Sequence, residues 1–291
     1  MNVFVTGGTG YVGNRIVDSL LHDGHQVTLL QRPGTTRPTP YDVKIVHGDL
    51  FSSQTLTRGL AGADAVVHLV GIIRERKRQG ITMQRIHVEG TKRIVEAATA
   101  SNVPRILHMS ALGARLNAVS AYHKSKWEAE GIVRTSGLQY TIFRPSVVYG
   151  KGGPGPEFLG QLTDLVRSAP VTPVIGDGHF LLQPISVETV AAAFVNALDR
   201  PEAIGKTYEL GGHDTVSYRK ILELIASRQN KSLRAVRIPV WMMKALVNAF
   251  GRFPWFPLTK DQLTMLLEGN VCDDSQRAVE ELQIAPKPFA L

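Results

Sequence analysis

The chain has 291 residues, of which 43% are hydrophobic and 20% charged. This length suits one large α/β domain, or one domain with a smaller lobe, and needs no cross-links to bury a core. The single cysteine, Cys272, excludes an internal disulfide and a Cys₄ or Cys₂His₂ metal site. The composition excludes a disordered protein, and no run of 18 apolar residues indicates a membrane span.

The formal net charge is +8, with 33 basic and 25 acidic side chains. A basic protein favours anionic partners such as nucleotide phosphates or an acidic membrane surface. No motif with base-stacking aromatics is present, so we expect a small-molecule substrate and no nucleic acid. The chain begins with a strand and a glycine loop instead of a signal peptide, which predicts a cytoplasmic protein.

Six short runs rich in Val, Ile and Leu lack polar alternation, as in strands buried on both faces. They lie at 3–5, 26–30, 43–47, 65–69, 105–110 and 140–144. Helical patterns lie among and after them at about 11–23, 53–61, 83–101, 119–136 and 187–199. Repeated βα units of this kind predict a Rossmann-like, doubly wound parallel sheet of the α/β class.

The regular alternation of strand and helix patterns ends after Gly150. Residues 151–156 have the sequence Lys-Gly-Gly-Pro-Gly-Pro, which predicts a loop. We expect residues 1–150 to form a dinucleotide-binding domain, with 181–210 returning to its sheet. The remaining segments, 151–180 and 211–291, would form a small C-terminal α/β lobe that contacts substrate or partners.

A glycine loop joins the first strand to the first helix. Gly8, Gly10 and Gly13 fit the G-x-G-x-x-G pattern in the strand–turn–helix context that a dinucleotide-binding site requires. Glycines permit a tight turn and a close approach of the backbone to a pyrophosphate, whose charge the helix N-terminus favours. The residues of this loop predicted to touch the cofactor are Gly7, Gly10, Tyr11, Val12 and Gly13.

The second strand ends at Gln31 and Arg32, where an NAD-selective site usually has Asp or Glu for the ribose 2′-hydroxyl. Arg32 could instead bind a 2′-phosphate through two charge-assisted hydrogen bonds. The sequence therefore favours NADP(H), with NAD(H) as the alternative if Arg32 is only a solvated loop residue.

The chain is similar to extended and atypical short-chain dehydrogenase/reductases, the NAD-dependent epimerase/dehydratase type. Motifs of that family follow its order over about residues 1–190: TGGTGYVG at 6–13, GDL at 48–50, VHLVG at 67–71, VEGT at 88–91, YHKSK at 122–126, RPSVVYG at 144–150 and QPISV at 183–187. The resemblance implies further cofactor contacts: Asp49 and Leu50 at the adenine, Val70 and Gly71 along the cofactor, and Pro145 at the nicotinamide.

The same resemblance implies a catalytic triad. Tyr122 would exchange the proton of a substrate carbonyl or alcohol, and Lys126 would bind the nicotinamide ribose and lower the pKa of Tyr122. Ser110 would hydrogen-bond the substrate oxygen. A Tyr and a Lys four residues apart share one face of a helix. In one departure from the pattern, His87 stands where catalytic relatives often have an Asn that keeps a proton relay to Lys126 in place.

The C-terminal part resembles the branch that contains the nucleotide-binding accessory subunit of respiratory complex I and its bacterial relatives. Ile238-Pro239, the run PLTKDQL at 257–263 and a late LQIAP carry this resemblance. Some members of that branch keep the cofactor for structural reasons.

The histidines show no metal-ligand spacing, so we assign no metal. His68 and His108 follow the pattern of hydrogen-bonded residues close to the core.

An apolar stripe runs along residues 238–250 at helical spacing. It consists of Ile238, Trp241, Met242, Ala245, Leu246, Ala249 and Phe250. Such a stripe usually covers the core of its own lobe. Its Trp and the nearby basic residues would alternatively suit a peripheral contact of 238–257 with a membrane or a redox complex.

Two functions remain open. The sequence favours an enzyme, an NADP(H)-dependent oxidoreductase that moves a hydride to or from a carbonyl, quinone-like or sugar-nucleotide substrate. The alternative is a non-catalytic, NADP(H)-binding assembly or accessory protein of a membrane redox complex. A sugar-nucleotide epimerase or dehydratase is less favoured, because no diphosphate clamp is recognisable in the lobe.

Overall fold

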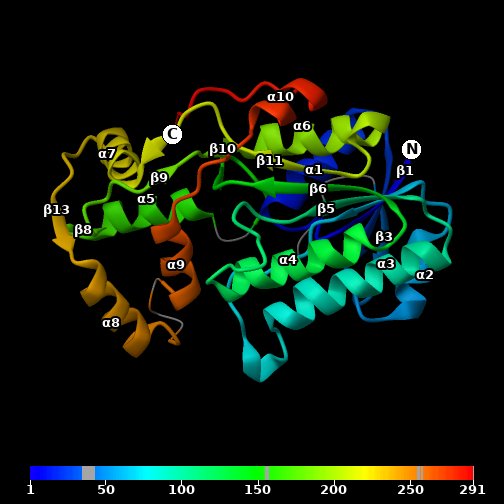
Figure 1. The fold of residues 1–291 in the computed structure, drawn as a ribbon, viewed down its shortest axis with the longest axis horizontal. Coiled ribbons are helices and arrows are strands. Elements are labelled where there is room, and N and C mark those ends of the chain that lie inside the picture. Colours follow the sequence, from blue (N-terminus) through cyan, green and yellow to red (C-terminus); the bar gives the residue numbers. More distant parts are fainter. Residues whose placement is uncertain (35–42, 155–156, 254–255, 257, 291) are drawn as a thin grey trace.

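The computed structural model describes residues 1–34, 43–154, 157–253, 256 and 258–290. A broad sheet with helices on both faces forms one part, and a smaller group of helices and short strands lies beyond one end of it (Figure 1).

Seven parallel strands form the central sheet. Their order is β11 (Lys206–Leu210), β6 (Gln139–Pro145), β5 (Arg105–Met109), β4 (Ala65–His68), β1 (Asn2–Thr6), β2 (Gln26–Gln31) and β3 (Lys44–His47). The six predicted strands are confirmed to within one residue at each end. The chain winds outward from β1 to β3 and then from β4 to β6 on the other side, so the carboxyl ends of β1 and β4 border a topological switch point.

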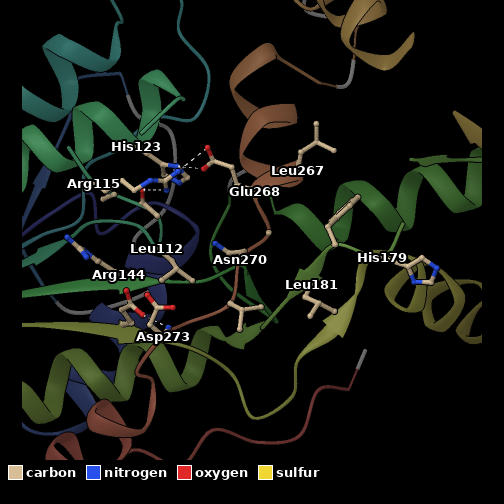
Figure 2. Close-up of a pocket in the computed structure, with 16 residues that line it drawn as sticks. Leu112, Arg115, His123, Arg144, His179, Leu181, Leu267, Glu268, Asn270 and Asp273 are labelled. Carbon is tan, nitrogen blue, oxygen red and sulfur yellow. Dashed lines mark hydrogen bonds and ion pairs between the residues drawn. The ribbon is translucent and has the colours of Figure 1, made fainter. Parts of the chain in front are cut away.

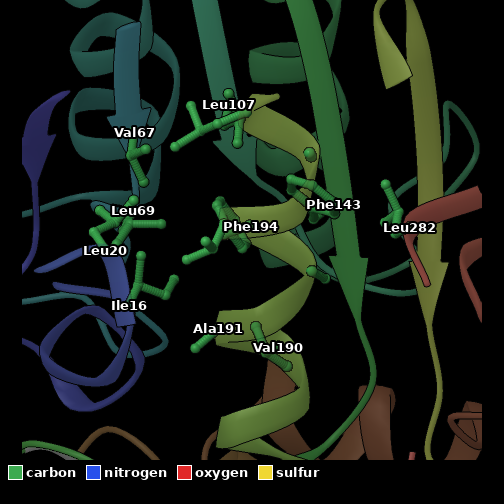
Figure 3. Close-up of a cluster of buried hydrophobic side chains, with 14 of the residues drawn as sticks. Ile16, Leu20, Val67, Leu69, Leu107, Phe143, Val190, Ala191, Phe194 and Leu282 are labelled. Atoms are coloured by element: carbon green, nitrogen blue, oxygen red, sulfur yellow. The ribbon is translucent and has the colours of Figure 1, made fainter. Parts of the chain in front are cut away.

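Two helices, α1 (Tyr11–His22) and α6 (Val187–Leu198), pack together on one face of the sheet. Phe194 of α6 reaches the sheet between Leu107 and Phe143, and its ring centroid lies 4.2 Å from that of Phe143 (Figure 3). The helix α10 (Gln276–Leu282) packs against α6 and β11. This side of the sheet holds the larger apolar core.

The other face is covered by α2 (Ser53–Leu60), α3 (Gly90–Ala100) and α4 (Ala121–Arg134). The helix predicted over 83–101 begins with a π-helical segment, Gln84–Glu89. There the carbonyl of His87 accepts a hydrogen bond from the Thr91 hydroxyl at 2.5 Å. Wide turns of this kind occur often at functional sites.

The lobe has its own apolar core, to which residues far apart in the chain contribute. Its helices are α5 (Phe158–Ser168), α7 (Tyr218–Arg228), α8 (Val240–Phe250) and α9 (Lys260–Glu268). Three short strand pairs complete it and link it to the sheet: β8 (Thr172–Ile175) with β13 (Ala235–Ile238), β9 (Leu181–Leu182) with β12 (Val216–Ser217), and β7 (Val148–Tyr149) with β10 (Ile185–Ser186). Single 3₁₀ turns lie at Lys77–Gln79 and Pro201–Ala203.

The expected role of the C-terminal apolar stripe in covering the lobe core is wrong. Ile238 ends β13, and Met243 and Val247 are the buried residues of α8. Trp241 is 72% exposed and Phe250 39% exposed. The helix is apolar on more than one side, so its spacing alone could not show which side the lobe would cover.

In the part of the chain that the structure describes, no helix is both long and apolar enough to span a membrane.

Candidate active site

The glycine loop closes tightly at the carboxyl end of β1. Gly7 has a φ of +80°, and its carbonyl oxygen accepts a hydrogen bond from Gly10 N at 3.0 Å. A Cβ on Gly13 would lie 2.2 Å from that same oxygen, so only glycine fits there. The loop thus leaves no room for side chains, as the backbone cradle for a pyrophosphate requires.

A second segment folds against the start of α1. Gly153 N donates to Tyr11 O at 2.8 Å, and the Tyr11 hydroxyl donates to Gly150 O at 2.9 Å. Val12 packs against the core beside it. The loop residues predicted to contact the cofactor therefore lie together at the switch point of the sheet.

The residues predicted at the adenine end follow β2 and β3. Arg32 is exposed. Asp49 is exposed and accepts a hydrogen bond from Phe51 N at 2.7 Å. Leu50 is buried against α3, where a Cβ on Gly90 would be 2.7 Å from its Cδ2.

The ends of β4 and β6 supply the other predicted cofactor contacts. Val70 N would be 3.0 Å from a Cβ on Gly7, so the backbones after β1 and β4 nearly touch. A Cβ on Gly71 would lie 3.2 Å from Lys126 Nζ. Pro145 ends β6, and its carbonyl accepts a hydrogen bond from Leu112 N at 3.0 Å.

Tyr122 and Lys126 lie on the first turns of α4, and Ser110 follows β5. The Ser120 hydroxyl starts this helix by accepting a hydrogen bond from His123 N. Lys126 Nζ donates to Met109 O at 2.9 Å, which places the ammonium next to Ser110 in the chain. Within the described residues the buried hydroxyl of Ser110 has no hydrogen-bond partner. Buried hydroxyls normally have one, so this group suits a bound oxygen atom.

Burial changes the proton affinities of the pair. It lowers the pKa of Lys126 to about 8, although Glu130 opposes the shift, and it raises the pKa of Tyr122 to about 12. The expectation that Lys126 lowers the pKa of Tyr122 is therefore wrong for the protein without ligand. Tyr122 is protonated at neutral pH and can donate a proton.

His87 joins the cofactor loop to the catalytic helix. Its Nε2 accepts a hydrogen bond from Ile72 N at 3.0 Å. Its Nδ1 lies 2.8 Å from the Ser125 hydroxyl, which in turn donates to Tyr122 O at 2.8 Å. This pattern requires a neutral ring with the proton on Nδ1, and burial lowers the pKa of His87 to about 2. Ser125 was not singled out in the sequence, although its place three residues after Tyr122 on one helix could have indicated it.

The two strand histidines differ from each other. His68 lies 2.6 Å from the Thr6 hydroxyl and 3.3 Å from that of Thr91, as expected for a hydrogen-bonded residue. His108 stacks on His68 with 5.4 Å between centroids, but neither of its buried ring nitrogens has a partner among the described residues. The prediction of a hydrogen-bonded His108 is therefore wrong.

A buried carboxylate organises the next turn of α4. Glu130 is fully buried and binds Arg144 through Nε at 2.9 Å and Nη2 at 2.7 Å, and it also pairs with Arg134. The Trp127 ring lies 4.8 Å and 5.6 Å from the two guanidinium carbons. The local sequence around Glu130 contains no pattern from which its pairing with Arg144 could have been predicted.

A cavity of about 740 Å³ opens between the sheet and the lobe. The loop after β5, α4, β6 and β11 form one wall, and residues 179–181 and 267–273 form the other. Figure 2 shows Arg115 and His123 in contact with Glu268 at one border of the cavity, with ion-pair distances of 3.1 Å and 3.7 Å. The ring of Tyr122 lies 5.7 Å, centroid to centroid, from that of His123, which lines the cavity, whereas Tyr122, Lys126 and Ser110 are not themselves lining residues.

Helix α9 of the lobe also contacts the start of α4. Asp261 Oδ1 accepts a hydrogen bond from Ala121 N at 3.0 Å. On the opposite border, Arg74 of the loop after β4 donates to the carbonyls of Gly251, Phe253 and Phe256.

Comparisons with known proteins agree with this geometry. The sequence model of the NAD dependent epimerase/dehydratase family matches residues 3–211. A ceramide reductase of Caulobacter vibrioides is 32% identical over 86% of this chain and 78% of its own length. The mitochondrial 40 kDa subunit of the NADH-ubiquinone oxidoreductase of Neurospora crassa is 25% identical over 98% of this chain and 76% of its own length.

Among solved structures, a dTDP-glucose 4,6-dehydratase from Streptomyces venezuelae with bound NAD superposes with a TM-score of 0.68 at 21% identity. The match covers 82% of this chain and 84% of that one. At this identity the likeness shows a shared fold.

Proposed function

Because the chain belongs to the NAD dependent epimerase/dehydratase family, we propose that it is an NADP(H)-dependent oxidoreductase. It transfers a hydride to or from a carbonyl, quinone-like or sugar-nucleotide substrate. The observation that carries this proposal is the placement of Lys126 Nζ beside Gly71 and on the carbonyl of Met109, next in the chain to the unpartnered Ser110 hydroxyl, with Tyr122 one turn before Lys126 on α4. The ceramide reductase among the relatives supports a reductase.

The glycine cradle and the orphan Ser110 hydroxyl fit a nicotinamide dinucleotide and a substrate oxygen. When bound, the nicotinamide supplies or accepts the hydride. Ser110 donates a hydrogen bond to the substrate oxygen, and Tyr122 gives that oxygen its proton in the reductive direction. Lys126 would bind the ribose hydroxyls of the cofactor.

We assign cofactor binding to residues 1–150 together with 181–210, and substrate or partner contact to 151–180 and 211–291. Arg32, exposed at the end of β2, supports NADP(H) as the cofactor because it can approach a 2′-phosphate. Dissociation constants for NADPH and NADH, measured for the wild type and Arg32→Ala, test this. Tighter binding of NADH by the wild type would contradict it.

A second function is supported by the exposed face of the lobe: peripheral contact with an anionic membrane surface, within a redox complex or alone. Trp241, Phe250 and Val236 are exposed there. Exposed basic residues lie close to them in the chain: Arg234, Arg237, Lys244 and Arg252. Apolar and cationic side chains on one surface suit the interface of an acidic bilayer. The similarity to a subunit of the Neurospora crassa NADH-ubiquinone oxidoreductase supports a contact within a redox complex.

Flotation with phosphatidylglycerol vesicles at low salt tests the membrane contact. Wild type should float, and Trp241→Ala combined with Lys244→Glu should not. Phosphatidylcholine vesicles serve as the uncharged control. Failure of the wild type to bind acidic vesicles would remove this proposal.

The first experiment for the enzyme is NADPH oxidation across short-chain quinones and carbonyl compounds, with Tyr122→Phe beside the wild type. Turnover lost in the variant while NADPH still binds would support the reductase. Tight NADPH binding without turnover in the wild type would instead favour the accessory protein.

A further inference from the structure

We infer that the cavity beside Tyr122 accepts an uncharged carbonyl compound with an extended apolar part, and not an anionic nucleotide sugar. This inference rests on the proposed oxidoreductase function and narrows its substrate class. It follows from two properties of the cavity wall: apolar side chains that nothing else covers, and cations that are already paired.

Apolar side chains line the cavity from both sides. Leu112 lies on the sheet side, and Phe180, Leu181, Leu267 and Val271 lie on the lobe side. Leu181 is 49% exposed and Val271 is 41% exposed, which is unusual for large apolar side chains inside a hollow. Figure 2 shows Leu267 beside Glu268 at the end of α9, and Leu181 farther from that charged group. An apolar ligand would remove this surface from water.

The loop that forms the sheet-side rim extends the apolar surface. Leu116, which is 79% exposed, follows the lining residues 112–115 directly, and Val119, which is 70% exposed, lies four residues beyond them. A ligand longer than the cavity could continue along this rim.

Arg144 is already paired with a buried carboxylate. Its Nε and Nη2 donate to Glu130, and the Trp127 ring centroid lies 5.6 Å from its guanidinium carbon. The side edge of the guanidinium that would bind a phosphate through Nε and Nη2 is therefore occupied, and its charge is balanced.

Arg115 is engaged in the same way. Its Nη1 donates to Gly113 O at 3.1 Å, and its Nη2 pairs with Glu268 at 3.1 Å. Because Glu268 belongs to the lobe, this pair also holds the two walls together.

The charge of the described lining opposes an anion. Its two arginines face three carboxylates, those of Glu209, Glu268 and Asp273. Burial lowers the pKa of His123, so this lining residue adds no charge at neutral pH. A diphosphate placed here would meet carboxylates without unpaired arginines to balance them, and such a like-charge contact excludes a ligand effectively.

The test compares two ligand series on the full-length protein with saturating NADPH. The first is a series of 2-alkanones from six to fourteen carbons, kept below their solubility limits. The second is UDP-glucose and dTDP-glucose. The rate constant kcat/KM should rise about threefold for each added CH₂ until the cavity is filled. Calorimetry should show no binding of either nucleotide sugar at 1 mM.

Two variants test the apolar lining and the paired arginine separately. Leu181→Asn should lower kcat/KM for the fourteen-carbon ketone at least tenfold and change the six-carbon value less than twofold. Glu268→Gln releases Arg115 and should raise the affinity for UDP-glucose at least fivefold. Glu280→Gln, an exposed change on α10, is the matched control and should alter neither value.

The outcomes distinguish the inference from the proposed function. Binding of UDP-glucose by the wild type, or a kcat/KM that does not depend on ketone length, would overturn the inference and leave the reductase standing. If no compound supports NADPH oxidation, the proposed function fails. Calorimetry with the ketones then decides the inference by itself, and affinity independent of chain length would refute it.

Discussion

The ring of His87 stands edge-on to the ring of Tyr122, with 5.5 Å between their centroids and 84° between their planes. His87 also hydrogen-bonds Ile72 N and the Ser125 hydroxyl. A single buried imidazole therefore contacts the segment after β4, the helix α4 and the ring of Tyr122, the proposed proton donor.

Replacing His87 by Ala should destabilise the protein and alter Tyr122. The Ile72 amide loses its acceptor and the Ser125 hydroxyl its imidazole partner, at a cost of about 2–4 kcal/mol in the free energy of unfolding. Water entering the space should lower the pKa of Tyr122 from about 12 toward 10. Urea unfolding and absorbance of tyrosinate at 295 nm measure the two effects.

The matched control for that change is His22→Ala, because His22 is exposed. The signal of Tyr122 is obtained by subtracting the titration of Tyr122→Phe. An unchanged titration of Tyr122 in His87→Ala would show that the imidazole does not keep water from the phenol.

The buried histidines predict a loss of stability in mild acid. The pKa of His68 is lowered to about 3 and that of His87 to about 2, first by burial and then by Lys126. Below the ordinary value near 6.5 the unfolded chain takes up protons that the folded chain does not, so stability falls as pH falls. From pH 7.5 to 5.5 these two residues together should remove about 3 kcal/mol.

Urea unfolding at the two pH values measures this loss. Burial also lowers the pKa of His108, which adds to the measured loss, so His68→Gln should remove only the share of one proton site, about 1.4 kcal/mol. Equal pH dependence in wild type and His68→Gln would contradict the assignment.

Two glycine-to-alanine changes test the cofactor cradle. Gly13→Ala places a Cβ 2.2 Å from Gly7 O, so the loop must shift, and the dissociation constant for NADPH should rise at least tenfold. Gly131→Ala meets nothing within 4 Å in the middle of α4 and should stabilise the protein by about 0.5–1 kcal/mol. Fluorescence titration with NADPH and thermal unfolding distinguish them. Equal affinity in the two variants would show that the loop does not bind the cofactor.

The carboxylate of Glu130 should be essential for stability. Glu130→Gln removes the charge that balances Arg134 and Arg144 in a buried place, at a cost of about 3–5 kcal/mol. Glu128→Gln changes an exposed residue on the same helix and should cost less than about 0.5 kcal/mol. Urea unfolding of both variants gives the comparison; a similar midpoint for the two would show that the buried pairs add little.

The sheet could be predicted because its central strands, β1 and β4 above all, are buried on both faces and therefore read as nearly unbroken apolar runs. The pairing of Tyr122 with Lys126 could also be predicted from the sequence, since the two residues lie one turn apart on one helix. The contacts that join the lobe to the sheet could not be predicted. Arg115 and Glu268, or Arg74 and Phe256, lie more than 150 residues apart, and no local pattern relates them.

The face of α8 shows another limit. Met243 and Val247 are as compatible with helical spacing as the stripe that includes Trp241, and only the packing of the lobe selects between them. For His108, the sequence showed a strand end but not whether a partner would lie within reach of the ring.

The hydrogen bond from Ala121 N to Asp261 has a consequence for how this lobe could be replaced. The residue before Tyr122 takes its capping acceptor from the lobe and not from its own domain. A chimera that grafts another lobe onto residues 1–150 would inherit the catalytic side chains but lose this acceptor unless the donor lobe supplies a carboxylate at the same point. Exchange of lobes between relatives would therefore have to preserve that one side chain, or realign the start of α4, whatever else about substrate choice it altered.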